Sequence, residues 1–547
     1  MLLHKNFWQR LIICPVIVSI LLLTVACGRE EISVADGDGA VAARPMVGGT
    51  LHIGSTQEPD YFDPIRSTSL ATSRLSNLVF DGLLKMDENM QYIPCLAKEV
   101  PTLANGGVSS DGLAVTYSLN PAAKWQDGTD VTAEDVVFTF GYIKKSDSAI
   151  YSELYRSISK VESAGDYTVI VHYRELRPDY LLAFPWVLPK HLLYRAGSKT
   201  LDAFFQAPVG SGPFIVENWR KGDLIEFRRN EAYFRGKPKL ELIHYHILES
   251  DEALLMQIKT RGVDIATDLP PDGLGRLERE SPLAVQIVPG LAWENVTFNL
   301  ERAPLDQLLV RQAFAAAVDQ QAILDVAFNG AGEATAGFLP QISWAHNHSL
   351  LASPGDPEKA KALLSRAGYA DSNGDRIMEK DGRALEIELL IPADDPARIR
   401  EADELALQLA RAGIRLKFRQ VSLPDMASRL AGGSFEAALV GWQLSPDPDQ
   451  RIFWHSAALP PDGKNYARYN NTRMDTLLDG GAASLDFSRR RDAYISAQLQ
   501  FVQDVPAVSI CFKGHVVCVS DTVANFKGNP TSQSDFWNAH EWQLLKK

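Results

Sequence analysis

The sequence has few cysteines and lacks the compact motifs of common enzyme classes. Its 547 residues include five cysteines with no CxxC pair, so cysteine-based metal binding is not expected. A G-x-S-x-G elbow, an HExxH helix and a glycine-rich phosphate loop are also absent. The acidic pair Asp447 and Asp449 lies in a proline-broken loop, where capping is its expected role. We therefore expect no catalytic residues and no cofactor.

Positive charge is in deficit. Lysine and arginine number 55 against 68 acidic residues, and the formal net charge of -13 argues against a nucleic-acid partner. No internal repeat or low-complexity segment is present, and the composition of 46% hydrophobic and 22% charged residues is that of a globular protein. A chain of this length is too long for one hydrophobic core, so at least two large domains are expected.

The N-terminus lacks an apolar run long enough for a permanent membrane helix. The run from Leu11 to Ala26 is shorter than the ~20 residues needed to span a bilayer, and it follows Lys5 and Arg10 as in a secretory signal. Thr24 to Cys27 resembles a bacterial lipobox, which implies that Cys27 is the lipidated first residue of the mature protein. An ordinary cleaved signal is the alternative. Residues 28–46 are interpreted as a tether.

Two other cysteines, Cys511 and Cys518, lie on either side of Lys513-Gly514. We interpret this dipeptide as a hairpin turn between two apolar strands. A disulfide and two buried thiols both remain open, because the register of the strands is unknown.

Alternating apolar residues predict strands at 49–54, 224–227 and 242–247. The longest helix is predicted over Asp306–Phe328, closed by Asn329-Gly330.

The clearest alternation of strands and helices lies in the second half of the chain. It consists of strand 385–391, helix 397–412, strand 414–421, a short helix at 425–430 and strand 437–442. This order predicts a parallel sheet with right-handed crossovers. Ligands of such sheets bind beyond the carboxyl ends of the strands, and Gln443 to Asp449 occupies that place.

One segment carries more information than the rest. Lys124 to Phe140 contains a turn at Asp127-Gly128 and a helix start at Thr132, with Asp135 three residues on as in a capping box. As a string it resembles the signature of the peptide/nickel-binding family of extracytoplasmic solute-binding proteins, family 5, which serve ABC importers. The resemblance continues in order at Glu58 to Pro64, Tyr92 to Glu99, Gly210 to Trp219, Arg229 to Pro238, Gly262 to Ile265, Arg311 to Asp319 and Gly441 to Ser456.

The resemblance implies an α/β, two-lobed periplasmic-binding-protein-like fold of the large, cluster C type. The implied boundaries are a signal at 1–27, the tether at 28–46, lobe I at 47–80 and 207–300, an extra subdomain of lobe I at 81–206, lobe II at 301–504 and a return to lobe I at 505–547. A ligand would lie between the lobes and stabilise their closed arrangement.

The resemblance also implies where a peptide would bind. Relatives hold an extended peptide against backbone from both lobes, and the matching positions are Thr68, Ser69 and Leu70 together with Gly441, Trp442, Gln443, Leu444 and Ser445. Trp442 suits either a pocket wall or a core position. Relatives that grip a free α-amino group use an Asp where Ser445 stands. Either Asp447 takes that role, or the ligand's amino terminus is not clamped; we favour the second.

Metal binding is not expected. His244 and His246 share one face of a predicted strand, and His346 and His348 have the same spacing in a loop, but neither pair has a third ligand nearby in the sequence. The acidic segment from Asp371 to Glu379 lacks the glycine and glutamate of a calcium loop and is interpreted as a turn held by Asx bonds.

The sequence thus predicts a lipid-anchored, extracytoplasmic binding protein of the periplasm or cell surface. It is expected to be a monomer that captures peptides, most often oligopeptides, and delivers them to the transmembrane subunits of an ABC permease. A carrier of nickel, a metallophore or another small solute, and a ligand-sensing receptor, are the alternatives.

Overall fold

The computed structural model describes residues 44–145 and 152–546. The predicted signal, Cys27 and nearly all of the tether lie outside these residues. Within them, no helix is both long enough and apolar enough to cross a membrane.

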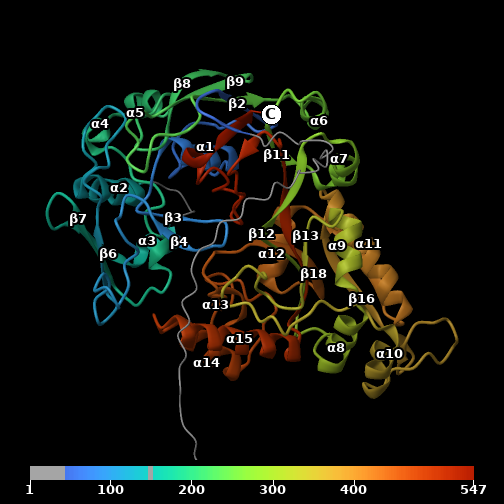
Figure 1. The fold of residues 1–547 in the computed structure, drawn as a ribbon. Helices are drawn as coiled ribbons and strands as arrows, with labels where there is room; N and C mark the ends of the chain where they lie inside the picture. The colour runs from blue at the N-terminus through green and yellow to red at the C-terminus, as the bar shows by residue number, and fades with distance from the viewer. Residues whose placement is uncertain (1–43, 146–151, 547) are drawn as a thin grey trace, which may run out of the picture. The chain divides into compact units, whose positions relative to one another are not determined.

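The largest sheet in the described ranges has eleven strands. Its order is β17 (Arg415–Val421), β16 (Glu386–Pro392), β18 (Ala437–Gln443), β12 (Ala284–Phe298), β19 (Ala507–Val519), β11 (Ile265–Leu269), β2 (Thr50–Ser55), β10 (Leu242–Ile247), β9 (Leu224–Arg229) and β8 (Phe214–Arg220), with β13 (Gly332–Ala334) beside β19. Strands from both ends of the chain therefore meet in one sheet (Figure 1).

The two largest hydrophobic clusters of the described residues lie along this sheet. One contains Leu51, Tyr245 and Trp542, so it combines the beginning and the end of the described chain. The other contains Phe298 and Leu405 and draws its members from residues 296–511. Separate cores on a shared sheet define two lobes.

The long strands β12 and β19 connect the lobes. They pair antiparallel along most of their length, and the register shifts between Val288 and Ala292. Strand β19 runs without a break through Lys513-Gly514, so the predicted hairpin there is wrong. Glycine in a strand often marks a close backbone approach instead of a turn, and a Cβ added at Gly514 would lie 2.7 Å from the carbonyl oxygen of Val288.

Cys511 and Cys518 consequently lie on the same strand, and both are free and buried. Seven residues of extended chain span roughly 23 Å, far more than the ~7 Å limit between the Cα atoms of a disulfide. Of the two alternatives, the structure shows two buried thiols.

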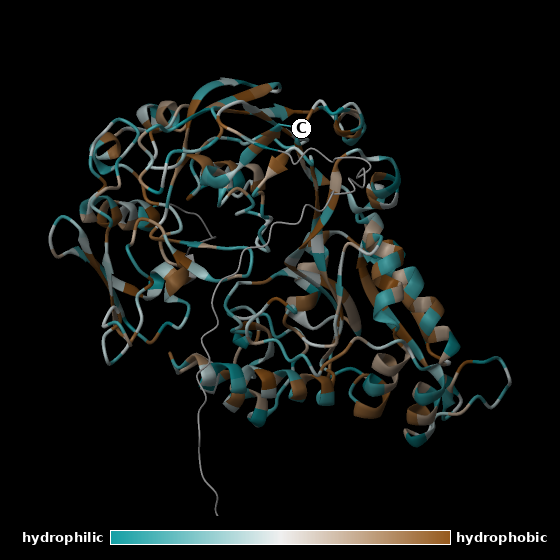
Figure 2. Ribbon diagram, viewed as in Figure 1, coloured by the Kyte–Doolittle hydropathy of each residue, from teal (hydrophilic) through white to brown (hydrophobic). Residues whose placement is uncertain are grey.

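The predicted β-α-β-α-β unit is confirmed in the second lobe. Strand β16 pairs parallel with β17 and with β18, and the connections are helices α11 (Pro396–Arg411) and α12 (Leu423–Gly432). The apolar face of α11 buries Ala402, Leu405 and Leu409, and brown and teal residues alternate along this helix in Figure 2. The segment that begins at Gln443 follows directly from the carboxyl end of β18.

The single long helix predicted at Asp306–Phe328 is wrong, but its predicted end at Asn329-Gly330 is confirmed, since Asn329 is a left-handed C-cap. The chain forms α8 (Leu308–Ala317) and α9 (Gln320–Phe328), with Val318 and Asp319 in extended conformation between them. Asp319 accepts a hydrogen bond from the backbone N–H of Ala322 at 3.0 Å and is the N-cap of the second helix.

A smaller sheet, β5-β7-β6, lies outside the main one. Its strands are Ala114–Ser118, Thr168–Tyr173 and Ile158–Ser163, with α2 (Ala133–Lys145) packed beside them. Asp135 accepts a hydrogen bond from the backbone N–H of Thr132 at 2.8 Å, which confirms the predicted helix start. The hairpin of β3 (Leu84–Met86) and β4 (Tyr92–Pro94) precedes this region.

The remaining elements are short strands and peripheral helices. They are α1 (Leu70–Val79), α3 (Ser152–Ser157), α4 (Lys190–Leu193), α5 (Ser198–Phe204), α6 (Asp251–Lys259), α7 (Leu274–Glu280), α10 (Pro357–Arg366), α13 (Arg451–Trp454), α14 (Thr472–Ala482), α15 (Phe487–Asp504), β1 (Arg44–Met46), β14 (Glu379–Lys380), β15 (Arg383–Ala384), β20 (Val523–Ala524), β21 (Gln543–Lys546) and the 3-10 turns 180–182, 271–273 and 539–541. The Asx bonds predicted near Asp371 are present, since its carboxylate accepts from the backbone N–H groups of Gly374 and Arg376.

Candidate functional site

A cavity of about 1130 Å³ lies where the two lobes meet. Small-molecule pockets usually measure ~300–1,000 Å³, so this one has room for a ligand longer than a single amino acid. Most of its wall comes from five segments of the chain, which are the β3–β4 hairpin, residues 177–186, residues 443–449, residues 451–463 and residues 531–537.

The second lobe contributes the segment that leaves the carboxyl end of β18. Gln443, Leu444, Ser445 and Asp447 line the cavity, together with Pro446 and Asp449. The predicted location of a ligand site beyond the ends of parallel strands therefore coincides with an actual cavity.

Asp447 is held by an arginine from the same lobe. Arg490 of α15 donates from Nη2 to both carboxylate oxygens, at 2.8 and 2.7 Å, and from Nε to the carbonyl oxygen of Gly481 at 3.0 Å. The two side chains are only 10% and 8% exposed. Burial raises the pKa of Asp447, and Arg490 opposes that rise. The carboxylate is therefore already neutralised inside the protein.

Three other charged residues or pairs of the wall are held by partners in the same way. Asp449 binds Arg451, with 2.8 Å between Oδ2 and Nη2. On the first lobe Arg177 binds Asp179 through two hydrogen bonds of 2.8 and 2.6 Å. Lys85 Nζ lies 2.8 Å from Asp81 Oδ1. Each pair joins residues of one lobe.

Tyr92 lines the cavity from the first lobe and lies near a charge of the second. It lies on β4 of the first lobe, and burial followed by the charge of Asp447 raises its pKa well above the usual value. Met90, in the same hairpin, belongs to a hydrophobic cluster that also contains Leu444 and Phe453 of the second lobe. The hairpin thus reaches across to the second lobe.

Five of the predicted contact residues do not line the cavity. Thr68, Ser69 and Leu70 precede and begin α1, where the Ser69 hydroxyl accepts from the backbone N–H of Thr72 at 3.3 Å. Gly441 and Trp442 lie just before the cavity wall, near the carboxyl end of strand β18. Their part in ligand binding stays a prediction.

The indole of Trp442 packs among other side chains. Its ring lies 5.2 Å from the ring of Phe453 and 6.0 Å from that of Tyr466, measured between centroids. Lys464 Nζ lies 4.7 Å above the same ring. These contacts place the side chain at the edge of the hydrophobic core, as one of the two alternatives for this residue requires.

Most of the first-lobe wall was not predicted. It includes Lys85, Tyr92, Asp179 and Trp186, and the C-terminal residues Thr531 to Trp537. These segments are irregular or short and meet only in the folded chain, so neither periodicity nor motif spacing marks them. Asn77 on α1 is the cavity residue nearest in sequence to the predicted Thr68–Leu70 segment.

The fold has two lobes that share one sheet, with a large cavity between the lobes. This arrangement defines the class of binding proteins that enclose their ligand. Residues 91–462 match the family described as bacterial extracellular solute-binding proteins, family 5 Middle. This match covers more than half of the chain, and the chain belongs to that family.

Several known proteins resemble the whole chain. Oligopeptide-binding protein AppA of Bacillus subtilis is 26% identical over 98% of this chain and 99% of its own length. The dipeptide-binding protein of Escherichia coli is 25% identical, with 89% and 94% covered. Among solved structures, AppA in complex with a nonapeptide has a TM-score of 0.67 at 27% identity, covering 92% of this chain and all of that one.

Two further solved structures resemble the chain, and one of them was solved with a nickel complex. NikZ of Campylobacter jejuni, solved with Ni(L-His), has a TM-score of 0.69 at 26% identity and covers 90% of this chain and 99% of its own. HbpA2 of Haemophilus parasuis has a TM-score of 0.80 at 23% identity, covers 91% of this chain and all of its own, and supports the fold.

Proposed function

We propose that this protein captures peptides, chiefly oligopeptides, between its lobes and delivers them to the transmembrane subunits of an ABC importer. The single observation that carries the proposal is the large cavity between the lobes, in whose wall Asp447, Asp449 and Asp179 are each paired with an arginine of the same lobe. Such a wall imposes no strong demand on the charge of a ligand's side chains. The relatives of this protein include binding proteins named for oligopeptides and dipeptides.

The backbone of the second lobe offers a strand edge to an extended ligand. Strand β16 pairs with β18 only at Ala437 and Ala438, whereas β12 pairs with β18 as far as Gln443. The other edge of β18 therefore has no strand partner beyond Ala438 in the described part of the chain. Backbone pairing along such an edge is indifferent to side chains, and each bond contributes a net ~1 kcal/mol.

Closure would take place where β12 and β19 lose register. Residues 289–291 fall between the two paired stretches of β12, and a Cβ at Gly290 would lie 2.1 Å from the carbonyl oxygen of Lys513. We place the hinge at this irregularity, since a displacement there costs few ladder hydrogen bonds. The proposed lobe boundaries at 207, 301 and 505 assign this crossing to lobe I and its return segment.

The first experiment is native mass spectrometry of freshly purified protein, followed by small-angle scattering with and without peptide. We expect a mixed population of co-purified peptides and a smaller radius of gyration after a peptide is added to stripped protein. A single non-peptide ligand, or scattering curves that do not change with any peptide, would contradict the proposal.

Membrane attachment through Cys27 is a further part of the proposal. It rests on the lipobox-like segment Thr24 to Cys27 and on the extracellular family to which the chain belongs. The mass of the N-terminal peptide from membrane-extracted protein tests it: a diacylglycerol-modified Cys27 supports the anchor, and an unmodified N-terminus elsewhere contradicts it. A Cys27→Ala variant should appear in the soluble extracytoplasmic fraction.

A nickel complex is the second candidate ligand, because NikZ, solved with Ni(L-His), resembles this chain over nearly its full length. His455 lies in the cavity wall, with its Nε2 3.3 Å from Asp479 Oδ2. Calorimetry with Ni(L-His) in the presence and absence of saturating peptide distinguishes the two ligands, since both would occupy the same cavity.

A further inference from the structure

Three histidines meet on one face of the first-lobe sheet. His52 comes from β2, and His244 and His246 come from the neighbouring strand β10. The two strands run parallel with His52 opposite His244, so His246, two residues on, points to the same face. The sequence spacing reveals the pair on β10 but not the third histidine, which the sheet register supplies from almost 200 residues away.

The ring nitrogens of these residues converge. One ligand nitrogen from each of the three lies within 4.8 Å of the others. His52 Nδ1 and His246 Nε2 are 3.0 Å apart. Two nitrogens bound to one Zn²⁺ at 2.0–2.1 Å and a tetrahedral angle would be roughly 3.3 Å apart. The existing spacing is therefore close to that of a metal-bound pair.

A carboxylate stands beside the three rings. Glu226 on β9 is the strand neighbour of His244, and its Oε1 lies 3.8 Å from His244 Nε2. The other oxygen of Glu226 accepts a hydrogen bond from Asn218 Nδ2 at 2.8 Å, which orients the carboxylate. Glu226 is thus placed as a fourth ligand or as the partner of a ligating ring.

The site is reachable from solvent and separate from the cavity. The side chains of His244 and Glu226 are 23% and 26% exposed, and none of these residues lines the cavity between the lobes. Strands β2 and β9 lie together at the top of Figure 1, away from β18. An ion bound here would tie strands of the first lobe and would not be the transported solute.

We propose that His52, His244 and His246 form a binding site for a divalent transition-metal ion, with Zn²⁺ as the preferred occupant and Ni²⁺ as a weaker substitute. Imidazole is a suitable ligand for both ions. Three histidines leave a fourth position of a tetrahedral site for Glu226 or water. The role of the ion is structural: it cross-links β2, the first strand of the main sheet in chain order, to β10.

The test uses the untagged mature protein after chelator treatment. Zn²⁺ is added in calorimetry, and Co²⁺ replaces it for absorption spectroscopy, where strong visible bands indicate tetrahedral coordination. We expect one ion per chain, and thermal unfolding should move to a higher temperature when the ion is bound. Saturating peptide should leave the affinity unchanged, whereas a metal site in the cavity would be blocked.

Variants identify the ligands. His246→Asn and His52→Asn should each weaken Zn²⁺ binding at least about 100-fold, because loss of a neighbouring orienting group alone costs 10- to 100-fold. His348→Asn is the matched control, since His348 is exposed and has the same spacing to His346 but belongs to no group of three ligands among residues 44–145 and 152–546. Absence of Zn²⁺ binding to the wild-type protein, or binding that survives in folded His246→Asn and His52→Asn proteins, would overturn the proposal.

Discussion

Ser445 determines how the cavity should treat the α-amino group of a peptide. It lines the cavity, and its hydroxyl oxygen accepts a hydrogen bond from the backbone N–H of Asp447 at 3.3 Å. The Asp447 carboxylate is occupied by Arg490. Within this loop, no carboxylate is therefore available to an ammonium group at the Ser445 position. The wild-type protein should bind a peptide and its N-acetylated form with affinities that agree within a factor of about three, which corresponds to ~0.7 kcal/mol.

Ser445→Asp introduces the missing charge. A charge-assisted hydrogen bond contributes about 1.5–3 kcal/mol, so the variant should prefer the free peptide over the acetylated one by about 10- to 150-fold. Ser445→Asn has nearly the same shape without the charge and should behave like the wild type. Arg490 is saturated by Asp447 and Gly481, so it should not neutralise the new carboxylate.

The assay is calorimetry of one peptide in free and acetylated form against the three proteins, at two salt concentrations. The preference of the Ser445→Asp variant should weaken at high salt because part of it is electrostatic. A wild-type protein that already loses more than tenfold in affinity on acetylation would refute the reasoning, since it would require a clamp elsewhere in the wall. An unchanged preference in Ser445→Asp would show that the peptide terminus does not reach this position.

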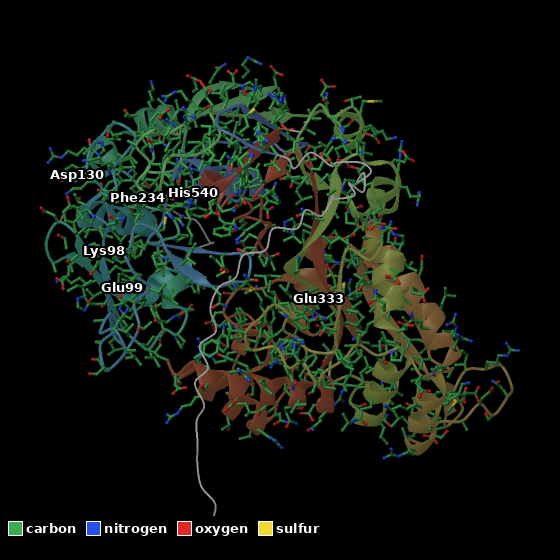
Figure 3. The ribbon with its side chains drawn as sticks, viewed as in Figure 1. Lys98, Glu99, Asp130, Phe234, Glu333 and His540 are labelled. Atoms are coloured by element: carbon green, nitrogen blue, oxygen red, sulfur yellow. The ribbon has the colours of Figure 1, made fainter. Side chains whose placement is uncertain are left out.

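Three other predictions concern the framework. Gly290→Val should destabilise the protein by about 1–3 kcal/mol in urea unfolding, because its Cβ would lie 2.1 Å from the Lys513 carbonyl, whereas Gly141→Ala, with open space around it, should not. Burial, followed by Arg235 and Lys85, lowers the pKa of His540 to about 3; its ring packs on Tyr233 beside Phe234 (Figure 3). In the unfolded chain His540 has a pKa near 6.5, so as the pH falls it is protonated there before it is protonated in the folded protein. The free energy of unfolding should therefore decrease by about 1.4 kcal/mol for each unit that the pH falls between 6.5 and 3. Urea unfolding of His540→Phe should show a correspondingly shallower pH dependence, and an equal slope would contradict the assignment. Cys511 and Cys518 should resist alkylation in the native protein and react after unfolding, since burial raises the pKa of both thiols, that of Cys518 to about 11; rapid native labelling would refute this.

The parts of the fold that the sequence revealed are those with regular periodicity. The β16–α11–β17 unit alternates strand and helix patterns of ordinary length, so both its elements and its parallel pairing were predictable. The same reasoning failed where one residue type is compatible with two local structures. The helix-forming, Ala-rich pattern continues through Val318 and Asp319. The break between α8 and α9 is marked only by Asp319, the N-cap of α9, which accepts a hydrogen bond from the backbone N–H of Ala322. Lys513-Gly514 resembled a turn, but the glycine serves a close approach between strands.

The cavity wall likewise has one part that could be predicted from the sequence and one part that could not. Gln443 to Asp447 follows a predictable strand, and its place beyond the carboxyl end of β18 follows from sheet topology. The opposing wall, with Tyr92, Asp179 and Trp537, comes from three irregular segments that converge only through long-range packing. The pairing of Asp447 with Arg490, 43 residues away, is likewise invisible in sequence, although it decides whether Asp447 can act as a clamp.

The pairing of charges within each lobe has a consequence for opening and closing. Arg177–Asp179 belongs to the first lobe, and Asp447–Arg490 and Asp449–Arg451 belong to the second, so these ion pairs stay intact whether the lobes are apart or together. Closure therefore does not have to break or form them, and the free energy that favours the closed state must come from the ligand itself. A ligand shifts the equilibrium only by its differential affinity for the two states. An extended peptide that contacts both walls satisfies this requirement through its backbone, which all peptides share, and selectivity among side chains should accordingly be weak.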